Sequence, residues 1–175
     1  MDAIATTAFV PGSFDPFHNG HLAVVEAAAS IFGRVIVGVG HNPEKPSGLF
    51  TPGERVDMIT ASVGHLPTVR ASTFTGLVTT AAAAVEASCL VKGIRSGSDL
   101  DTEMVQANTN SRTGGPQTVF IPAVGPAALV ASRYLREIGT HGGDISSLVP
   151  EPVWNAMQVK AEQMKSVHAT TGVLE

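Results

Sequence analysis

The sequence predicts an α/β fold: a single domain, doubly wound around a five-stranded parallel sheet, with a helix at its C-terminal end. Two observations carry this prediction. Short apolar runs of the kind that form buried strands alternate along the chain with segments of helical periodicity. Such alternation implies parallel strands joined by right-handed helical crossovers that cover both faces of the sheet. The 175 residues, 43% of them hydrophobic, can bury one sizeable core and are too few for two.

The first half of the chain contributes three strands and two helices. Strands are predicted where apolar residues run together, over 4–10, 34–40 and, in a partly polar run, 68–74. A helix is predicted over 21–32 because its apolar residues recur at helical spacing. The next helix begins after Thr51, which is followed three residues later by Glu54 in the pattern of a capping box.

The second half contributes two strands and four helices. Strands are predicted over 89–94 and 118–124, and helices over 77–88, 99–111, 128–139 and 150–165. The turn RTGGPQ precedes the fifth strand. A polar tail is predicted to fray from about Ser166, so the chain divides into a domain over 1–165 and a tail over 166–175. The predicted architecture is Rossmann-like.

Composition argues against several classes of protein. The formal charge of −4 and the pI near 5.8 disfavour a protein that holds nucleic acid by its phosphates. The single cysteine, Cys89, lies in an apolar run and is interpreted as a small buried thiol. The start, MDAIATTAFV, has no basic region typical of a signal peptide, and no apolar run approaches the roughly 20 residues that span a bilayer. We therefore expect a cytoplasmic protein that binds neither nucleic acid nor membrane.

The stretch VPGSFDPFHNGH lies where the first strand ends and the first helix begins. Ligands of such sheets bind at the carboxyl ends of the strands. Gly12 lets a backbone N–H approach a ligand, and Gly20 precedes a helix start that favours an anion. His18 and His21, three residues apart, can converge on one point. Together with the hydroxyl of Ser13, they predict a phosphate cradle rather than an acid/base pair.

Other interpretations of this stretch stay open. The two histidines could cap the helix, or could bind a metal, although an i, i+3 pair without a third ligand nearby makes a poor zinc site. Asp15, which precedes Pro16, could shape the turn or contact a ligand. A nicotinamide dinucleotide site is rejected, because the glycines of VGVGHNP are followed by neither a third glycine nor a helix.

The residues of three further segments extend the pattern. PGSFDPFHNGH resembles the nucleotidyltransferase motif of histidine or threonine, any residue, glycine, histidine, and in particular that of the phosphopantetheine adenylyltransferase family. NPEKPSGLFTPGERVDMI, VKGIRSGSDLDTEMVQANTN and GGDISSLVPEPVW resemble successive segments of the same family. The similarity covers the chain from about Phe9 to Trp154, and the combination is specific where each piece alone would be weak.

The resemblance implies a direct transfer reaction. The phosphate of 4′-phosphopantetheine would attack the α-phosphorus of ATP, giving dephospho-coenzyme A and pyrophosphate without a covalent protein intermediate. The protein would contribute positioning and charge stabilisation, with Mg²⁺ assisting. It also implies coenzyme A as a feedback inhibitor and a homo-oligomer, commonly a hexamer.

Residues on the nucleotide side follow from the resemblance position by position. His21 would contact the ATP phosphates and stabilise the pentacovalent transition state, Arg95 would bind the phosphates, and Glu103 would lie near the ribose and adenine. The implied ATP-binding set is Pro11, Gly12, Ser13, Phe14, His18, His21, Arg95, Glu103, Ser132 and Arg133. From its helix position alone, Glu103 could equally be an exposed charge.

On the acceptor side, Ser13 would orient the attacking phosphate, Lys45 would hold the reacting phosphates, and Lys92 would bind the phosphate of phosphopantetheine. The implied acceptor-binding set is Ser13, Lys45, Gly76, Leu77, Val78, Lys92 and Asn110, and the implied catalytic set is His21, Ser13, Lys45 and Arg95; no residue is assigned to a metal. Plainer interpretations exist for a solvated loop lysine, an asparagine at a turn, and apolar residues that pack in a core, which apply to Lys45, Asn110, Leu77 and Val78.

The chain departs from the family pattern in the late loop VASRYLR and in the motif itself. His18 stands where threonine is usual, which adds a donor. In the late loop Ser132 and Arg136 stay in register, but Ala131 lacks a hydroxyl, and Arg133 could clamp a phosphate or point to solvent. One lost donor would cost about 1–3 kcal/mol of transition-state stabilisation.

Alternatives to the leading function stay open. Gly76 and Thr102 replace an aspartate and an aromatic residue of the family, on the acceptor and nucleobase sides. The same fold could therefore serve another phosphate acceptor, such as nicotinamide mononucleotide or glycerol 3-phosphate. A third alternative is a weakened paralogue that binds adenine nucleotide or coenzyme A, against which the joint presence of His21, Lys45, Lys92 and Arg95 argues. A fourth, an α/β protein with no nucleotide site, would make the placement of the glycines, histidines and cations a coincidence.

Overall fold

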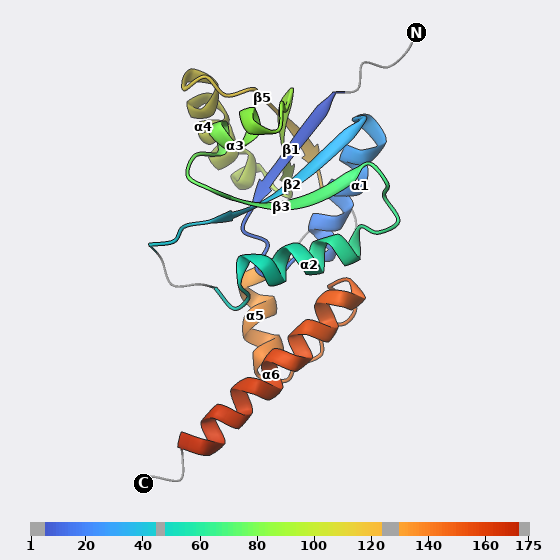
Figure 1. Ribbon diagram of the computed structural model, residues 1–175, viewed down its shortest axis with the longest axis vertical. Helices are drawn as coiled ribbons and strands as arrows, with labels where there is room; N and C mark the ends of the chain where they lie inside the picture. The colour runs from blue at the N-terminus through green and yellow to red at the C-terminus, as the bar shows by residue number, and fades with distance from the viewer. Residues whose placement is uncertain (1–5, 45–47, 124–129, 172–175) are drawn as a thin grey trace.

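The computed structural model describes residues 6–44, 48–123 and 130–171 and places a five-stranded parallel sheet at the centre of the molecule (Figure 1). The strands are β1 (Thr7–Gly12), β2 (Arg34–His41), β3 (Val69–Thr75), β4 (Cys89–Ile94) and β5 (Gln117–Pro122). Their order in the sheet is β3-β2-β1-β4-β5. The chain therefore winds outward from β1 to one edge, returns, and winds to the other, which confirms the doubly wound five-stranded prediction.

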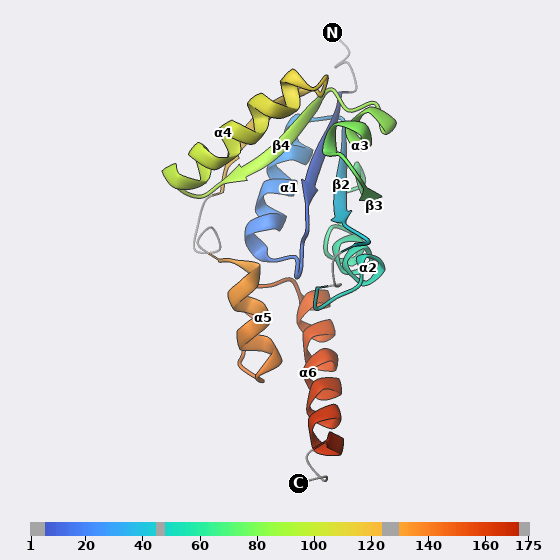
Figure 2. The same ribbon diagram turned by 90° about the vertical axis from the view of Figure 1, so that its left-hand side faces the viewer.

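Helices cover both faces of this sheet (Figure 2). They are α1 (Asn19–Ile31), α2 (Pro52–Ser62), α3 (Val78–Ala84), α4 (Gly97–Arg112), α5 (Ser132–Thr140) and α6 (Glu151–Thr171). Successive residues of β1 point to opposite faces: Val10 belongs to the core cluster that includes residues of α1 and α2, whereas Phe9 belongs to a second cluster with Ala82 of α3. A central strand that is buried on both faces reads as a continuous apolar run, which is why β1 is recognisable in the sequence.

The α5–α6 pair lies below the carboxyl edge of the sheet, and α6 extends away from the body of the molecule (Figures 1 and 2). Val153, Met157 and Ala161 recur every four residues along α6 and are buried. Lys160 Nζ lies 2.9 Å from Glu54 Oε1, so an ion pair joins α6 to the start of α2. None of the described helices is long and apolar enough to cross a membrane.

Several predicted boundaries differ from the observed ones. Strand β1 continues to Gly12, two residues past the predicted end, because Pro11 and Gly12 pair with β2. Helix α3 ends at Ala84, short of 88, since Glu86 has a positive φ of 54°. Helix α5 begins only at Ser132, because Ala131 occupies its N-cap position with an extended backbone. Helix α6 continues past Ser166 to Thr171, because no glycine or proline interrupts residues 166–171.

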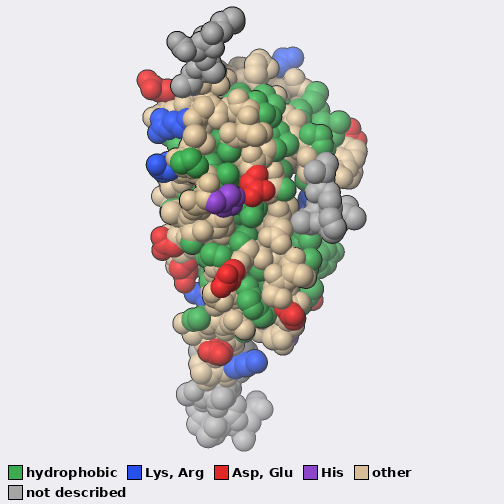
Figure 3. Space-filling view, turned by 90° about the vertical axis from the view of Figure 1, so that its right-hand side faces the viewer, with side chains coloured by type: hydrophobic (Ala, Val, Ile, Leu, Met, Phe, Trp, Pro, Cys, Tyr) green, Lys and Arg blue, Asp and Glu red, His purple; other side chains and the backbone are tan. Residues whose placement is uncertain are grey.

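Cys89 is buried in β4, and burial raises the pKa of its thiol, as expected for a small thiol with a packing role. On the face shown in Figure 3, positive and negative side chains are interspersed without a large patch of one sign. This distribution agrees with the modest net charge of −4.

A close approach at Gly38 in β2 gives a first prediction. A Cβ added at Gly38 would lie 2.3 Å from Cζ of Phe9, whose ring is buried and packs edge-on against Phe74 at 5.5 Å. Gly38→Ala is therefore expected to lower the free energy of unfolding by about 1–3 kcal/mol, because the buried ring must shift. The measurement is urea denaturation.

Gly53→Ala is the matched control, because a Cβ at Gly53 in the first turn of α2 would meet nothing within 4 Å. We expect that change to be neutral or to stabilise the protein by up to about 1 kcal/mol. Equal unfolding midpoints for the two variants would contradict the packing argument.

Candidate active site

Two adjoining cavities open at the carboxyl edge of the sheet, with volumes of about 390 and 240 Å³. The larger is lined by Val10, Pro11, Gly12, Ser13, Phe14, His18, Gly20, His21, Val24, Val91, Lys92, Gly93, Arg95, Glu103, Ala123, Ala131 and Ser132. The smaller is lined by Pro11, Gly12, Ser13, Gly40, Phe74, Val78, Leu90, Lys92, Glu103, Gln106, Ala107, Asn110 and Thr118. Ser13, Lys92 and Glu103 line both cavities and so stand at their junction.

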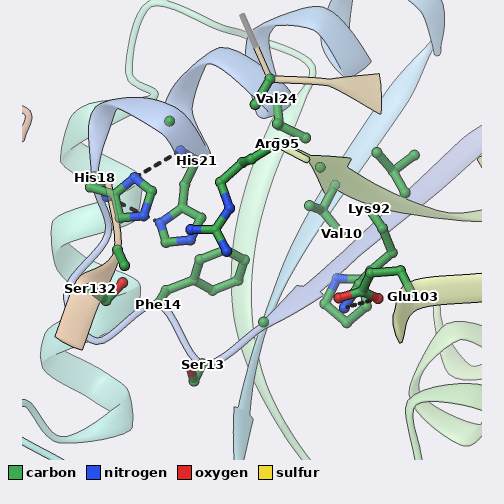
Figure 4. A pocket seen from close by; sticks show the side chains of 17 residues that line it. Val10, Ser13, Phe14, His18, His21, Val24, Lys92, Arg95, Glu103 and Ser132 are labelled. Carbon is green, nitrogen blue, oxygen red and sulfur yellow. Dashed lines mark hydrogen bonds and ion pairs between the residues drawn. The ribbon is translucent and has the colours of Figure 1, made fainter. Parts of the chain in front are cut away.

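His18 and His21 begin α1 through a reciprocal pair of hydrogen bonds. The backbone N–H of His21 donates to Nδ1 of His18 at 3.3 Å, and the backbone N–H of His18 donates to Nδ1 of His21 at 3.2 Å. The two rings stack with centroids 3.6 Å apart and planes 20° from parallel. The capping interpretation is therefore confirmed, and it orients both rings into the larger cavity (Figure 4).

This cap fixes which ring nitrogen carries the proton. A backbone N–H can only donate, so each Nδ1 must be unprotonated, and a neutral imidazole then carries its hydrogen on Nε2. Burial, with the nearby charge of Arg95, lowers the pKa of His18 to about 4. Burial, with the charges of His18 and Arg95, lowers the pKa of His21 well below its usual value. Near neutral pH the site thus presents two neutral Nε2–H donors, which suit phosphate oxygens and cannot accept a proton at Nε2.

A pH dependence of stability follows from these lowered values. Between the unfolded pKa of 6.5 and the folded pKa of about 4, the unfolded chain binds more protons at His18 than the folded protein does. The free energy of unfolding should therefore fall as pH decreases through this window, by about 3 kcal/mol from His18 alone. Protonation at Nδ1 would also remove the acceptor of the cap.

Urea unfolding midpoints between about pH 7 and about pH 4 measure this dependence. His18→Asn is the control, because asparagine can cap a helix and does not titrate. We expect its midpoint to vary less with pH than that of the unsubstituted protein. An identical slope in both proteins would show that His18 does not contribute.

The ring of Phe14 packs against His21 of the histidine pair. Its φ of 50° lies in the left-handed region that a bulky residue rarely adopts, and this turn folds the ring back beneath Gly12. A Cβ at Gly12 would lie 2.7 Å from Cζ of Phe14, so only glycine fits there. The ring meets His21 edge-on at 5.0 Å and Phe17 at 5.8 Å. The strained turn therefore also directs Ser13, the intervening residue, to the junction of the two cavities.

Asp15 shapes the loop rather than lining either cavity. Its buried carboxylate accepts the backbone N–H groups of Leu49 at 2.9 Å and Phe50 at 3.1 Å. It also lies 3.5 Å from Nε of Arg55 and 3.6 Å from Nη1 of Arg136. Asp15 thus connects the motif loop to α2 and α5, which agrees with the turn-shaping interpretation.

Two cations stand at the carboxyl end of β4, as predicted, and each pairs with a carboxylate of α4. Lys92 Nζ lies 3.1 Å from Glu103 Oε2. The Nε of Arg95 lies 2.8 Å from Asp99 Oδ2, and this pairing lowers the pKa of Asp99. The two pairs place positive charge beside the neutral histidine donors without leaving an uncompensated charge in the free protein.

The start of α5 completes the larger cavity. The hydroxyl of Ser132 donates to the carbonyl of Pro16 at 2.9 Å, which joins α5 to the motif loop. Ala131 at the N-cap position supplies no side-chain acceptor, so the first N–H groups of α5 stay available to a ligand.

The structure does not bring every predicted residue to the cavities. Arg133 donates to the hydroxyl of Tyr134 at 2.7 Å, stacks over that ring and does not line either cavity. Gly76 has a positive φ of 77°, and Leu77 is 68% exposed; neither lines a cavity, whereas Val78 does. Lys45 lies outside the described residues.

Helix α4 contributes a line of residues to the smaller cavity, two of which are not among the predicted site residues. Glu103, Gln106, Ala107 and Asn110 all face the smaller cavity and follow one another at helical spacing. Glu103 and Asn110 are predicted site residues, and their helical spacing is the sequence signal that points to Gln106 and Ala107 between them. Within the described ranges, no group of three or more His, Cys, Asp or Glu residues could hold a metal ion.

The five-stranded parallel sheet and the two histidine donors at the start of α1, which line the larger cavity, define an α/β protein of the Rossmann-like class. A family model described as cytidylyltransferase-like matches residues 9–138. A phosphopantetheine adenylyltransferase from Nocardioides sp. is 39% identical over 155 residues, covering 89% of this chain and 97% of its own. The enzymes of that name from Haemophilus influenzae and Corynebacterium efficiens are 39% and 40% identical, over 89% of this chain and 99% and 98% of theirs. The chain therefore belongs to the cytidylyltransferase-like family and, within it, to the phosphopantetheine adenylyltransferases.

A solved structure supports the fold separately. It is a Vibrio parahaemolyticus protein that carries the name nicotinate-nucleotide adenylyltransferase, with a TM-score of 0.63. It covers 89% of this chain and 99% of its own, at 20% identity, a level at which the likeness concerns the fold alone. The predicted family resemblance and fold class are both confirmed.

Proposed function

We propose that this protein transfers the adenylyl group of ATP to 4′-phosphopantetheine, releasing pyrophosphate and forming dephospho-coenzyme A. The observation that carries the proposal is the pair of neutral Nε2–H donors at the start of α1, in a cavity that also holds Lys92 and Arg95. Such a site binds and stabilises phosphate groups. The name of the relatives, phosphopantetheine adenylyltransferase, indicates which acceptor receives the adenylyl group.

The residues present account for direct transfer. An oxygen of the acceptor phosphate forms a bond to the α-phosphorus, while the bond from that phosphorus to the bridging oxygen breaks and pyrophosphate leaves. Because the attacking phosphate is already ionised, no general base is needed, which agrees with histidines that stay neutral and act as donors. Charge that develops on the transferring group meets fixed donors from His18 and His21 and the positive charge of Arg95.

In this proposal each of the two cavities binds one substrate. ATP fits the larger cavity, between the histidine pair and the start of α5, and the pantetheine arm fits the smaller one, between Phe74, Val78 and Asn110. Lys92 lines both and can hold the acceptor phosphate where the cavities meet. Ser13 stands at the same junction, so its hydroxyl supports the prediction that it orients the attacking phosphate.

Mg²⁺ would enter with the nucleotide. Glu103 is the only carboxylate among the described lining residues of the larger cavity, and Lys92 already neutralises it. A site with so few carboxylates fits Mg²⁺ that is held mainly by phosphates and water, as is usual for this ion. The ion would supply further neutralisation of the phosphates.

We also propose a cytoplasmic homo-oligomer, a hexamer by family resemblance, that coenzyme A inhibits as a feedback ligand. Helix α4 buries none of its side chains, and Leu100, Met104 and Val105 are exposed on it. Exposed apolar side chains on one helix support a contact between subunits. Light scattering of the purified protein measures the assembly, and a monomer at micromolar concentration would contradict it.

The function is tested by pyrophosphate release from the purified protein with Mg²⁺, ATP and 4′-phosphopantetheine. We expect release that requires both substrates, with dephospho-coenzyme A identified by mass spectrometry. CTP in place of ATP, and nicotinamide mononucleotide or glycerol 3-phosphate in place of the acceptor, should give little product. Product from one of these instead, or ATP binding without turnover, would overturn the proposal.

A further inference from the structure

We infer that Asp99 is a positioning residue for the transfer reaction. Its carboxylate fixes the guanidinium of Arg95 beside the histidine pair. The inference rests on the proposed function, because it takes Arg95 as a ligand of the nucleotide phosphates. Asp99 lines neither cavity, so it acts only through Arg95.

Asp99 holds Arg95 through three donors. Oδ2 of Asp99 accepts from Nε of Arg95 at 2.8 Å and from its backbone N at 3.3 Å, and Oδ1 accepts from Nη2 at 3.3 Å. A carboxylate that meets both Nε and Nη2 fixes the plane of the guanidinium, which a single bond would leave free to turn. On the opposite side, Nη1 donates to the carbonyl of Val130 at 3.1 Å.

This clamp leaves part of the guanidinium available. Three of its five N–H bonds point to Asp99 and Val130, and two have no partner among the described residues. Figure 4 shows the guanidinium directed toward His21 and Phe14, within the larger cavity. The charge of Arg95 contributes to lowering the pKa of both His18 and His21, as expected for a cation held close to them. The free N–H groups and the histidine donors thus face the same cavity.

Stability alone does not explain the pair. The side chains of Arg95 and Asp99 are 38% and 27% exposed, and an exposed i, i+4 pair adds little to stability. Arg95 also precedes the N-terminus of α4, where the helix dipole disfavours a cation. Asp99, in the first turn, offsets that effect and keeps the cation at the cavity.

The test compares Asp99→Asn with Asp101→Asn. Asp101 lies on the same helix, is exposed and has no partner among the described residues, so its variant removes the same charge without touching Arg95. We expect Asp99→Asn to lower kcat by about 10- to 100-fold, the effect of a misplaced catalytic group, with the KM for ATP changed much less. Asp101→Asn should match the unsubstituted protein.

A double-mutant cycle separates positioning from a structural role. In the background of Arg95→Met, adding Asp99→Asn should cause less than about a twofold further loss, because the group that Asp99 positions is gone. A full further loss would overturn the inference, and so would an increase in kcat/KM for ATP with Asp99→Asn, which would mean that Asp99 only masks Arg95.

Nuclear magnetic resonance distinguishes failure of this inference from failure of the proposed function. The Nε–H signal of Arg95, assigned by its loss in Arg95→Met, should exchange slowly with water in the unsubstituted protein and in Asp101→Asn, and rapidly in Asp99→Asn. An unchanged signal in Asp99→Asn would overturn the inference alone. Absence of turnover by the unsubstituted protein with ATP and 4′-phosphopantetheine would overturn the proposed function and, with it, the role of Asp99 in transfer.

Discussion

His21→Asn is expected to lower kcat by about 10²–10³-fold while the protein stays folded. The side-chain oxygen of asparagine can occupy the place of Nδ1 and accept the backbone N–H of His18, so the start of α1 is preserved. Asparagine ends before the position of Nε2, so the donor that faces the larger cavity is lost. The measurement is steady-state pyrophosphate release at saturating substrates, with the unfolding midpoint measured on the same sample.

The complementary variant is His21→Gln. Glutamine reaches the position of Nε2 with an amide N–H and places no acceptor at Nδ1, so it keeps a donor and loses half of the reciprocal cap. We expect it to retain more activity than His21→Asn and to be less stable. The opposite order, with His21→Asn the more active, would show that the cap and not the donor is what catalysis requires.

Lys92→Met is expected to raise the KM for 4′-phosphopantetheine by about 100-fold, which corresponds to about 3 kcal/mol of lost charge-assisted binding. Methionine keeps most of the stem of the lysine but removes the charge where the two cavities meet. The KM for ATP should change much less. Initial rates measured against each substrate in turn supply both constants.

Lys92→Arg is the control, because it keeps the positive charge and can still pair with Glu103. We expect its KM for the acceptor to stay within about tenfold of the original value. Lys92→Met also leaves the carboxylate of Glu103 without its partner, so circular dichroism should confirm that the variant is folded. Equal losses in both variants would indicate that packing, and not charge, sets acceptor affinity.

Much of the fold could be predicted because the relevant signals are local. The apolar run of β1 and the capping box of Thr51 and Glu54 are properties of adjacent residues, and the structure shows both as expected. The predicted start of α5 is too early, because the periodicity of the segment does not show that Ala131 has an extended backbone. Helix ends depend on such single backbone angles, which residue type only biases.

The site was predictable where position in the sheet determines it. Lys92 and Arg95 lie at the carboxyl end of β4, so the rule for parallel sheets places them together with the motif loop. The role of Asp15 could not be chosen from the sequence, because its partners Leu49, Arg55 and Arg136 are distant along the chain. Likewise, nothing in the sequence shows that Arg133 pairs with its neighbour Tyr134 instead of facing a phosphate.

The connections of Asp15 have a consequence for biosynthesis. Residues 13–21 are made early, but the backbone carbonyls of Asp15 and Pro16 find their donors on Arg136 and Ser132, more than 100 positions later. While a ribosome is still translating the middle of the chain, β1, α1 and α2 can associate, and Asp15 can meet its partners Leu49, Phe50 and Arg55 but not Arg136. The larger cavity then lacks Ala131 and Ser132, which line it at the start of α5. A nascent chain consequently has no complete catalytic pocket until α5 has left the exit tunnel, so folding of the C-terminal segment is the step that makes each new molecule competent.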